Sequence, residues 1–145
     1  MNSEKKTATI LEDPKINIKI KLAGLWASIL FLFIYVDYFG LFIPGAMEKI
    51  IAGEVAHTGI QITQVFLLAV IILMMIPSLM IFLSLALKAK WNRWTNIIVG
   101  IFKIVVVVAG MIGESWAYIY FGSIVEVVLL SLIVWYAWKW PKQEA

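Results

Sequence analysis

The chain has 145 residues, of which 63% are hydrophobic and only 14% are charged, and its formal net charge is +3. A soluble domain is about half apolar and about a quarter charged, so this composition indicates one compact unit that lies mostly in lipid. No cluster of basic residues resembles a nucleic-acid-binding arm, which excludes nucleic acid as an expected partner.

Residues for metal and thiol chemistry are scarce. The chain has no cysteine and a single histidine, His57. Disulfides, thiolate metal sites and iron–sulfur ligation are therefore excluded, and one histidine alone cannot form a zinc site or a bis-histidine haem site. The chain also has no phosphate-cradling glycine loop, no HExxH motif and no nucleophile elbow. We expect no metal and no cofactor. Whether the protein is an enzyme stays open, although the missing motifs argue against it.

Four long apolar runs follow one another along the chain. They cover residues of about 22–43, 60–87, 94–112 and 116–138. Each is long enough to cross a hydrocarbon core of roughly 30 Å as a helix, and none alternates polar and apolar residues as a barrel strand does. The sequence therefore predicts an all-α bundle of four transmembrane helices over 22–140, with a lead over 1–21 and a tail over 141–145.

The first span ends at Pro44-Gly45, and the loop over 44–59 is the longest connection. This span is longer than a signal-peptide core and contains Asp37, so we expect a retained anchor. The stretch Ala46–Ala52 is compatible with a short helix at the membrane surface. The loop is then either a lid or a plain connector.

The later connections are short, over 88–93 and 113–115. Short turns predict that spans two and three, and spans three and four, are antiparallel neighbours. Pro77 lies inside the second span and lacks a backbone donor, which predicts a kink there.

Basic residues gather on one side of the predicted membrane. Lys49 is the one basic residue of the opposite side, and six of the seven tryptophans, Trp26 among them, are expected as interfacial anchors near the basic side. Basic loops face the cytoplasm, so both termini are predicted to be cytoplasmic. The basic side comprises Lys5, Lys6, Lys15, Lys19, Lys21, Lys88, Lys90, Arg93, Lys139 and Lys142.

Lys103 and Glu126 lie inside the third and fourth spans. Counting from Trp94 and Trp116 places both roughly 14–15 Å into their helices, near mid-membrane. Because these helices are predicted neighbours and pairing lowers the cost of burying charge, the sequence predicts a Lys103–Glu126 ion pair. This pair is either a functional site or a structural contact that fixes helix register.

Small and polar residues accompany both charges at helical spacing. The two faces are formed by Asn96, Gly100 and Lys103, and by Gly122, Ser123 and Glu126. Small residues at such positions either let helices approach closely or leave space for water or a ligand.

Asp37, Gln61 and Gln64 are predicted to lie nearer the outer surface. Asp37 comes seven residues before Pro44, and the two glutamines are three residues apart at the entrance of the second span. On one helix face they would point the same way and could form a vestibule above the Lys103–Glu126 level. Glutamines in membrane helices also serve as hydrogen-bond partners between helices.

The leading hypothesis is an intramembrane polar site that binds or moves a small molecule or a proton. Glu126 would be the titratable group, Lys103 its charge partner, and Asp37, Gln61 and Gln64 the entrance contacts. The first alternative is a membrane-embedded acid–base enzyme or redox accessory acting on a lipophilic substrate such as a quinone, with Asp37 and Glu126 as acid and base. The second is a structural subunit of a membrane complex. The expected surroundings are the lipid bilayer, with a homo-oligomer or a membrane partner left open.

Five segments stand out along the chain: Asp37-Tyr38-Phe39, Ile43-Pro44-Gly45, Gly59–Gln64, Asn92–Ile97 and Val134–Trp140. Together they resemble a family of small bacterial four-span membrane proteins of unknown function. The similarity covers nearly the whole chain beyond residue 20 and implies a multi-pass protein of the cell (plasma) membrane, the bacterial inner membrane, without implying an activity. The architecture is also loosely similar to the DoxX-like four-span proteins, some of which are linked to quinone or redox systems.

Overall fold

The computed structural model describes residues 11–56 and 58–142, and in this part the chain forms helices and no strands. Four of the helices are long and apolar enough to cross a membrane, which confirms the prediction of an all-α, four-span protein. The protein is therefore an integral membrane protein. Lys5, Lys6 and His57 lie outside the described residues. The helices are α1 (Ile18–Gly40), α2 (Ala46–Ile51), α3 (Gln64–Ala86), α4 (Ala89–Gly110) and α5 (Ala117–Trp138).

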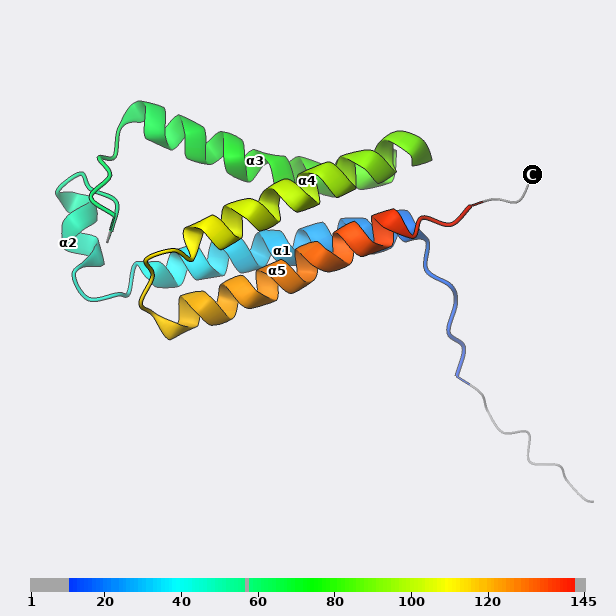
Figure 1. Cartoon of the computed structure of the whole chain (residues 1–145), viewed down its shortest axis with the longest axis horizontal. Coiled ribbons are helices and arrows are strands. Elements are labelled where there is room, and N and C mark those ends of the chain that lie inside the picture. The colour runs from blue at the N-terminus through cyan, green and yellow to red at the C-terminus, as the bar shows by residue number, and fades with distance from the viewer. Residues whose placement is uncertain (1–10, 57, 143–145) are drawn as a thin grey trace, which may run out of the picture.

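The four long helices form a bundle with two distinct ends (Figure 1). The terminal end carries the start of α1 and the end of α5, and the loop end carries α2 and the α4–α5 turn. Helix α1 packs against α3 and α5, and α4 packs against α5. Helices α3 and α4 do contact each other, but less extensively than these pairs. Figure 1 shows the reason: α3 lies near α4 at the terminal end and diverges from the bundle toward the loop end.

Two helices begin earlier than the apolar runs predict. Helix α1 begins at Ile18 because Asn17 caps it, with Oδ1 accepting from the Lys19 backbone N–H at 2.9 Å. Helix α4 begins at Ala89, so the connection to α3 shrinks to residues 87–88. Hydropathy defines where a helix enters lipid, whereas capping and the absence of Gly and Pro define where it begins.

The buried core lies toward the terminal end. It includes Leu22, Trp26 and Ile29 of α1, with Leu130 and Ile133 of α5, each with no exposed surface. The prediction that Trp26 is an interfacial anchor is therefore wrong. Hydropathy and position place a tryptophan near a membrane surface, but they do not reveal on which side of its helix it lies.

Two glycines allow close packing of helices against α5. A Cβ added at Gly100 of α4 would lie 2.7 Å from Cγ2 of Val134, and one at Gly122 of α5 would lie 2.7 Å from Cγ2 of Val36. Both distances are shorter than van der Waals contact. Of the two uses of small residues left open by the sequence, these two glycines serve the close approach of helices.

Helix α3 is buried in only one half. Its buried residues are Pro77, Met80 and Ser84, all toward the terminal end, and the helix continues through Pro77 as one element. The half toward the loop end, from Gln64 onward, contributes no buried residue. Toward the loop end, α3 therefore packs only loosely against the rest of the bundle.

Candidate functional site

A cavity of about 500 Å³ lies in the loop-end half of the bundle. All four long helices and the α1–α3 connection contribute to its wall. At its inner end lie Phe33, Lys103 and Glu126, and α2 and the following loop line it with Ile50, Val55 and other apolar side chains. Its volume is within the range of roughly 300–1,000 Å³ typical of small-molecule sites.

The cavity brings together the three ionisable residues of the spans. Asp37 of α1, Lys103 of α4 and Glu126 of α5 all line it. Lys103 is 1% exposed and Glu126 is 4% exposed, whereas Asp37 is exposed. Three helices thus carry one positive and two negative groups to one mostly apolar space, and Glu114 of the α4–α5 turn adds a third carboxyl group to its wall.

The direct Lys103–Glu126 ion pair predicted from the sequence is not formed. Among the described residues the one ion pair is Lys49–Glu54, far from this level in the α2 region. The ammonium of Lys103 instead lies 4.5 Å from the centroid of the Phe33 ring. A ring face stabilises a cation through its quadrupole without using any of the three N–H donors. Helix spacing gives the level of a side chain but not its rotamer, and this limit accounts for the error.

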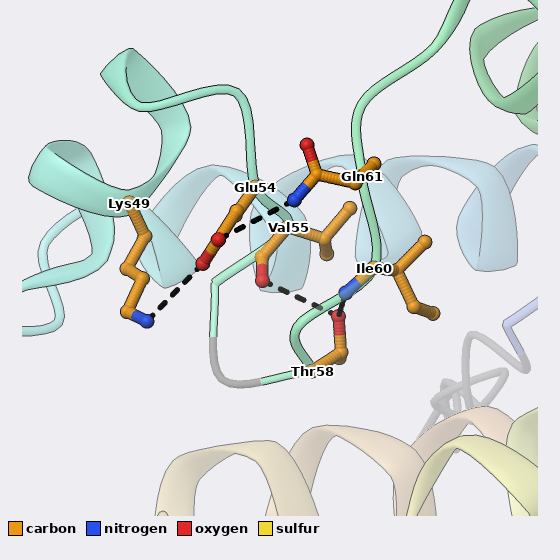
Figure 2. Close-up of polar contacts among 6 residues, drawn as sticks. All are labelled: Lys49, Glu54, Val55, Thr58, Ile60 and Gln61. Carbon is orange, nitrogen blue, oxygen red and sulfur yellow. Dashed lines mark hydrogen bonds and ion pairs between the residues drawn. The ribbon is translucent and has the colours of Figure 1, made fainter.

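Contacts within the α1–α3 connection hold it together, and Figure 2 shows those made by the side chains of Glu54 and Thr58. Val55 N–H donates to Ile60 O at 2.7 Å, and Ile62 N–H donates to Gly53 O at 2.7 Å. Glu54 accepts from Lys49 Nζ at 3.2 Å and from Gln61 Nε2 at 3.3 Å. The short helix predicted within Ala46–Ala52 is confirmed as α2.

The sequence predicts Gln61 and Gln64 as contacts at the entrance of the site, but neither glutamine lines the cavity. Gln61 is bridged to Glu54 in the connection, and α3 begins only at Gln64, after its N-cap Thr63. The two side chains therefore do not share a helix face, and neither is among the cavity residues. The alternation of apolar and polar residues before Gln64 belongs to an extended segment, which a helical reading of this stretch misses.

Asn96 lies in a separate buried network at the terminal end. Its Oδ1 accepts from Trp26 Nε1 at 2.7 Å and from Ser84 Oγ at 3.3 Å, and its Nδ2 donates to Asn92 Oδ1 at 2.7 Å. Asn92 Nδ2 donates in turn to Ser84 O at 2.6 Å. The network ties α1, α3 and α4 together and satisfies groups that would be costly to bury alone. Asn96 shares a face with Lys103 but does not reach the cavity.

Tyr118 is a cavity residue that the sequence argument missed. It precedes Gly122 and Glu126 at intervals of four, so it shares their face of α5, and this spacing could have identified it. Its Oη is buried and has no hydrogen-bond partner among the described residues. A buried hydroxyl without a partner is a group that a ligand or a water molecule can satisfy.

The cavity can hold a molecule that is largely apolar and carries a hydrogen-bonding or charged group. Phe33, Leu73 and Val107 offer apolar walls, while Lys103 and the carboxyl groups offer donors and acceptors at one end. In residues 11–56 and 58–142, no three side chains of the His, Cys, Asp and Glu types gather as metal ligands would.

Comparison with known proteins gives one finding. No curated protein and no solved structure matches the chain. A family model does match it over residues 10–145, which is nearly the whole chain and includes all five helices. The similarity to the DoxX-like group stays a prediction. The chain belongs to a family of unknown function, DUF6326.

Proposed function

We propose that the protein binds a small molecule in the intramembrane cavity, with Lys103 and Glu126 as the polar contacts at its inner end and Asp37 at its mouth. One observation carries the proposal: three ionisable side chains from three helices line the same cavity, and none of them forms an ion pair within the described part of the chain. Ionisable groups at bilayer depth are costly unless they are partnered, and by default they mark functional sites.

The wall chemistry supports an amphiphilic ligand. Side chains such as Val36, Leu73 and Met74 would contact an apolar body, and the polar end of the ligand would meet Lys103 and Glu126. A neutral or anionic group that accepts from the ammonium and donates to the carboxyl group satisfies both residues at once.

Binding is favoured over free passage. The cavity residues closest to the terminal end are at the level of Phe33 and Lys103. Beyond them, the core around Trp26 and the hydrogen bonds of Asn96 fill the space between the helices. Movement of a proton or solute across the membrane would require this half to open, or a second copy to complete a pathway.

A second candidate function is acid–base catalysis on a lipophilic substrate such as a quinone. The favouring observation is that the two carboxyl groups of the spans, Asp37 and Glu126, line one cavity with mostly apolar walls, which Glu114 of the α4–α5 turn also lines. One group would remove a proton and the other would supply one, as in isomerisation. This function uses the same site, so substrate turnover separates it from simple binding.

We also propose the placement of the protein in a cell membrane. The terminal end carries eight described basic residues, from Lys15 to Lys142, whereas the loop end carries Lys49 together with Glu48, Glu54 and Glu114. The positive-inside rule supports a cytoplasmic terminal end and a cavity that faces outward, as in a bacterial inner membrane.

The test is native mass spectrometry of protein extracted gently from its membrane. We expect a reproducible additional mass on the wild type that is lost in Glu126→Gln and in Lys103→Met. Asp13→Asn serves as the matched control, because Asp13 is exposed and lies before α1. Thermal unfolding of each variant separates loss of the ligand from loss of the fold.

The other outcomes are equally informative. Wild-type protein that carries no additional mass, and variants that behave as wild type in every assay, would overturn the binding site. A bound lipid that the protein converts would favour the acid–base enzyme. A co-purifying protein that is lost with Glu126→Gln would favour a structural subunit.

A further inference from the structure

A second cavity, of about 200 Å³, lies at the terminal end of the bundle. It is formed where the first turn of α4 meets the tail that follows α5. Its lining includes three basic side chains, Lys90, Arg93 and Lys142, and two tryptophans, Trp94 and Trp140. None of the described residues that line it is acidic. Three positive groups around one small space favour an anion.

Arg93 is held in this cavity by aromatic faces. Its guanidinium carbon lies 5.8 Å from the ring centroid of Trp94 and 5.6 Å from that of Trp138. Its Nε is buried and has no hydrogen-bond partner among the described residues. A ring face attracts the cation but leaves its N–H donors available, and the planar fork of a guanidinium matches the oxygens of a phosphate group.

The surroundings add positive potential. A larger cavity of about 810 Å³ adjoins the first, shares Ala89, Trp140 and Pro141 with it, and is lined by further lysines, among them Lys15 and Lys139. Helix α4 also presents its N-terminal end here, without a side-chain cap. That end carries a partial positive charge, which adds to the attraction.

The tryptophans indicate where the anion comes from. Trp94 and Trp138 are about half exposed on the outside of the bundle, where bilayer lipid surrounds a spanning helix. Tryptophans of this kind lie at headgroup level. A phosphate held by Arg93 would therefore be at the depth of lipid phosphates, with acyl chains along the apolar surface of α4 and α5.

We propose that this cavity binds the phosphate group of an anionic phospholipid. Arg93 supplies the bidentate contact, and Lys90 and Lys142 supply positive charge from the helix and from the tail. The site is separate from the intramembrane cavity and does not depend on which side of the membrane the terminal end faces.

The test uses purified full-length protein and native mass spectrometry with added phosphatidylglycerol, phosphatidylcholine or inorganic phosphate. We expect phosphatidylglycerol to bind in preference to phosphatidylcholine. Arg93→Gln is expected to weaken phosphatidylglycerol binding about tenfold and Lys142→Gln about fivefold. Lys88→Gln is the matched control, because Lys88 is exposed just before α4 but does not line the cavity. We expect this variant to bind phosphatidylglycerol within about twofold of wild type. Since Lys142 lies in the tail after α5, its variant tests the site even if Arg93→Gln fails to fold.

Three results would overturn the proposal. Equal binding of the two lipids would show that the site does not distinguish an anionic headgroup from a zwitterionic one. An equal loss with Lys88→Gln would show attraction to the whole basic surface and not to a site. Displacement of the lipid by an equal concentration of inorganic phosphate would indicate a site for free phosphate.

Discussion

The ammonium of Lys103 lies 4.5 Å from the centroid of the Phe33 ring, so a cation inside the bundle is stabilised by an aromatic face. Phe33 is itself 6% exposed, and both residues line the inner end of the cavity. The ring offsets part of the free-energy cost of burying the Lys103 ammonium and leaves the cavity beside it open. The carboxyl groups of Asp37 and Glu126 then remain available to other partners.

Replacing Phe33 should therefore affect stability through Lys103. We expect Phe33→Leu to lower the free energy of unfolding by about 0.5–2 kcal/mol beyond the packing loss, through the missing cation–ring attraction. Thermal unfolding of Phe33→Leu, Lys103→Met and the double variant measures this coupling. Strictly additive effects of the two substitutions would contradict the interaction.

The Trp26–Asn96 hydrogen bond should contribute to the stability of the terminal half. Trp26→Phe keeps a ring but removes the donor, which leaves buried Asn96 Oδ1 with a weaker set of partners. We expect a loss of about 1–3 kcal/mol, measured by thermal unfolding in detergent. Trp91→Phe is the control, because Trp91 is 68% exposed. Equal effects of the two variants would show that the network has no special role.

Alanine at the two close-approach glycines should destabilise the bundle. Gly100→Ala and Gly122→Ala each place a methyl group 2.7 Å from a valine carbon, and overpacking of this kind costs about 1–3 kcal/mol. Gly24→Ala is a control of opposite sign. It lies within α1 with nothing within 4 Å of the new Cβ, and a helical Gly→Ala change stabilises by roughly 0.5–1 kcal/mol. Unfolding temperatures of the three variants check the ordering.

The contacts of Glu54 should order the α1–α3 connection without supporting the whole fold. Glu54→Ala removes the bonds to Lys49 and Gln61, and exposed pairs of this kind contribute only about 0.2–1 kcal/mol. We expect an almost unchanged unfolding temperature but faster hydrogen exchange at the Val55 and Ile62 amides. Unchanged exchange at both amides would show that the backbone bonds alone hold the connection.

Orientation in the membrane can be measured directly because the chain has no cysteine. We expect Thr58→Cys, in the α1–α3 connection, to react with a membrane-impermeant maleimide on intact cells. Lys142→Cys, at the terminal end, should react only after permeabilisation. The reverse pattern would show that the cavity faces the cytoplasm.

The sequence predicts the elements of this fold better than their contacts. Hydropathy identifies four spans, because the cost of an unpaired backbone in lipid leaves a helix as the one solution for such runs. The burial of Lys103 and Glu126 follows from spacing, which also places Gly100 and Gly122 on the same helix faces, but only the structure shows that these glycines allow close approach of the helices. Their rotamers do not follow, so the expected ion pair is replaced by a contact with Phe33.

Two other errors arise because the sequence does not give the rotation of a helix about its axis or the backbone conformation of a loop. Nothing in the composition around Trp26 shows that it turns inward to Asn96, since helix rotation is set by packing. Spacing predicts that the glutamines share a helix face, although Gln61 belongs to a loop that is bridged to Glu54 and held by backbone hydrogen bonds. The closeness of Asp37 to the level of Lys103 likewise required the three-dimensional arrangement of α1, α4 and α5.

The one-sided burial of α3 has a consequence for how the protein responds to its surroundings. Since the buried residues of α3 all lie between Pro77 and Ser84, lipid acyl chains must provide most of the packing around the half that begins at Gln64. The tilt of that half is then partly a property of the bilayer, and a thinner or thicker membrane is expected to move it. Because Phe66 and Leu73 of this half line the intramembrane cavity, the dimensions of that cavity should vary with membrane thickness, so ligand affinity measured in detergent should differ from that in lipid.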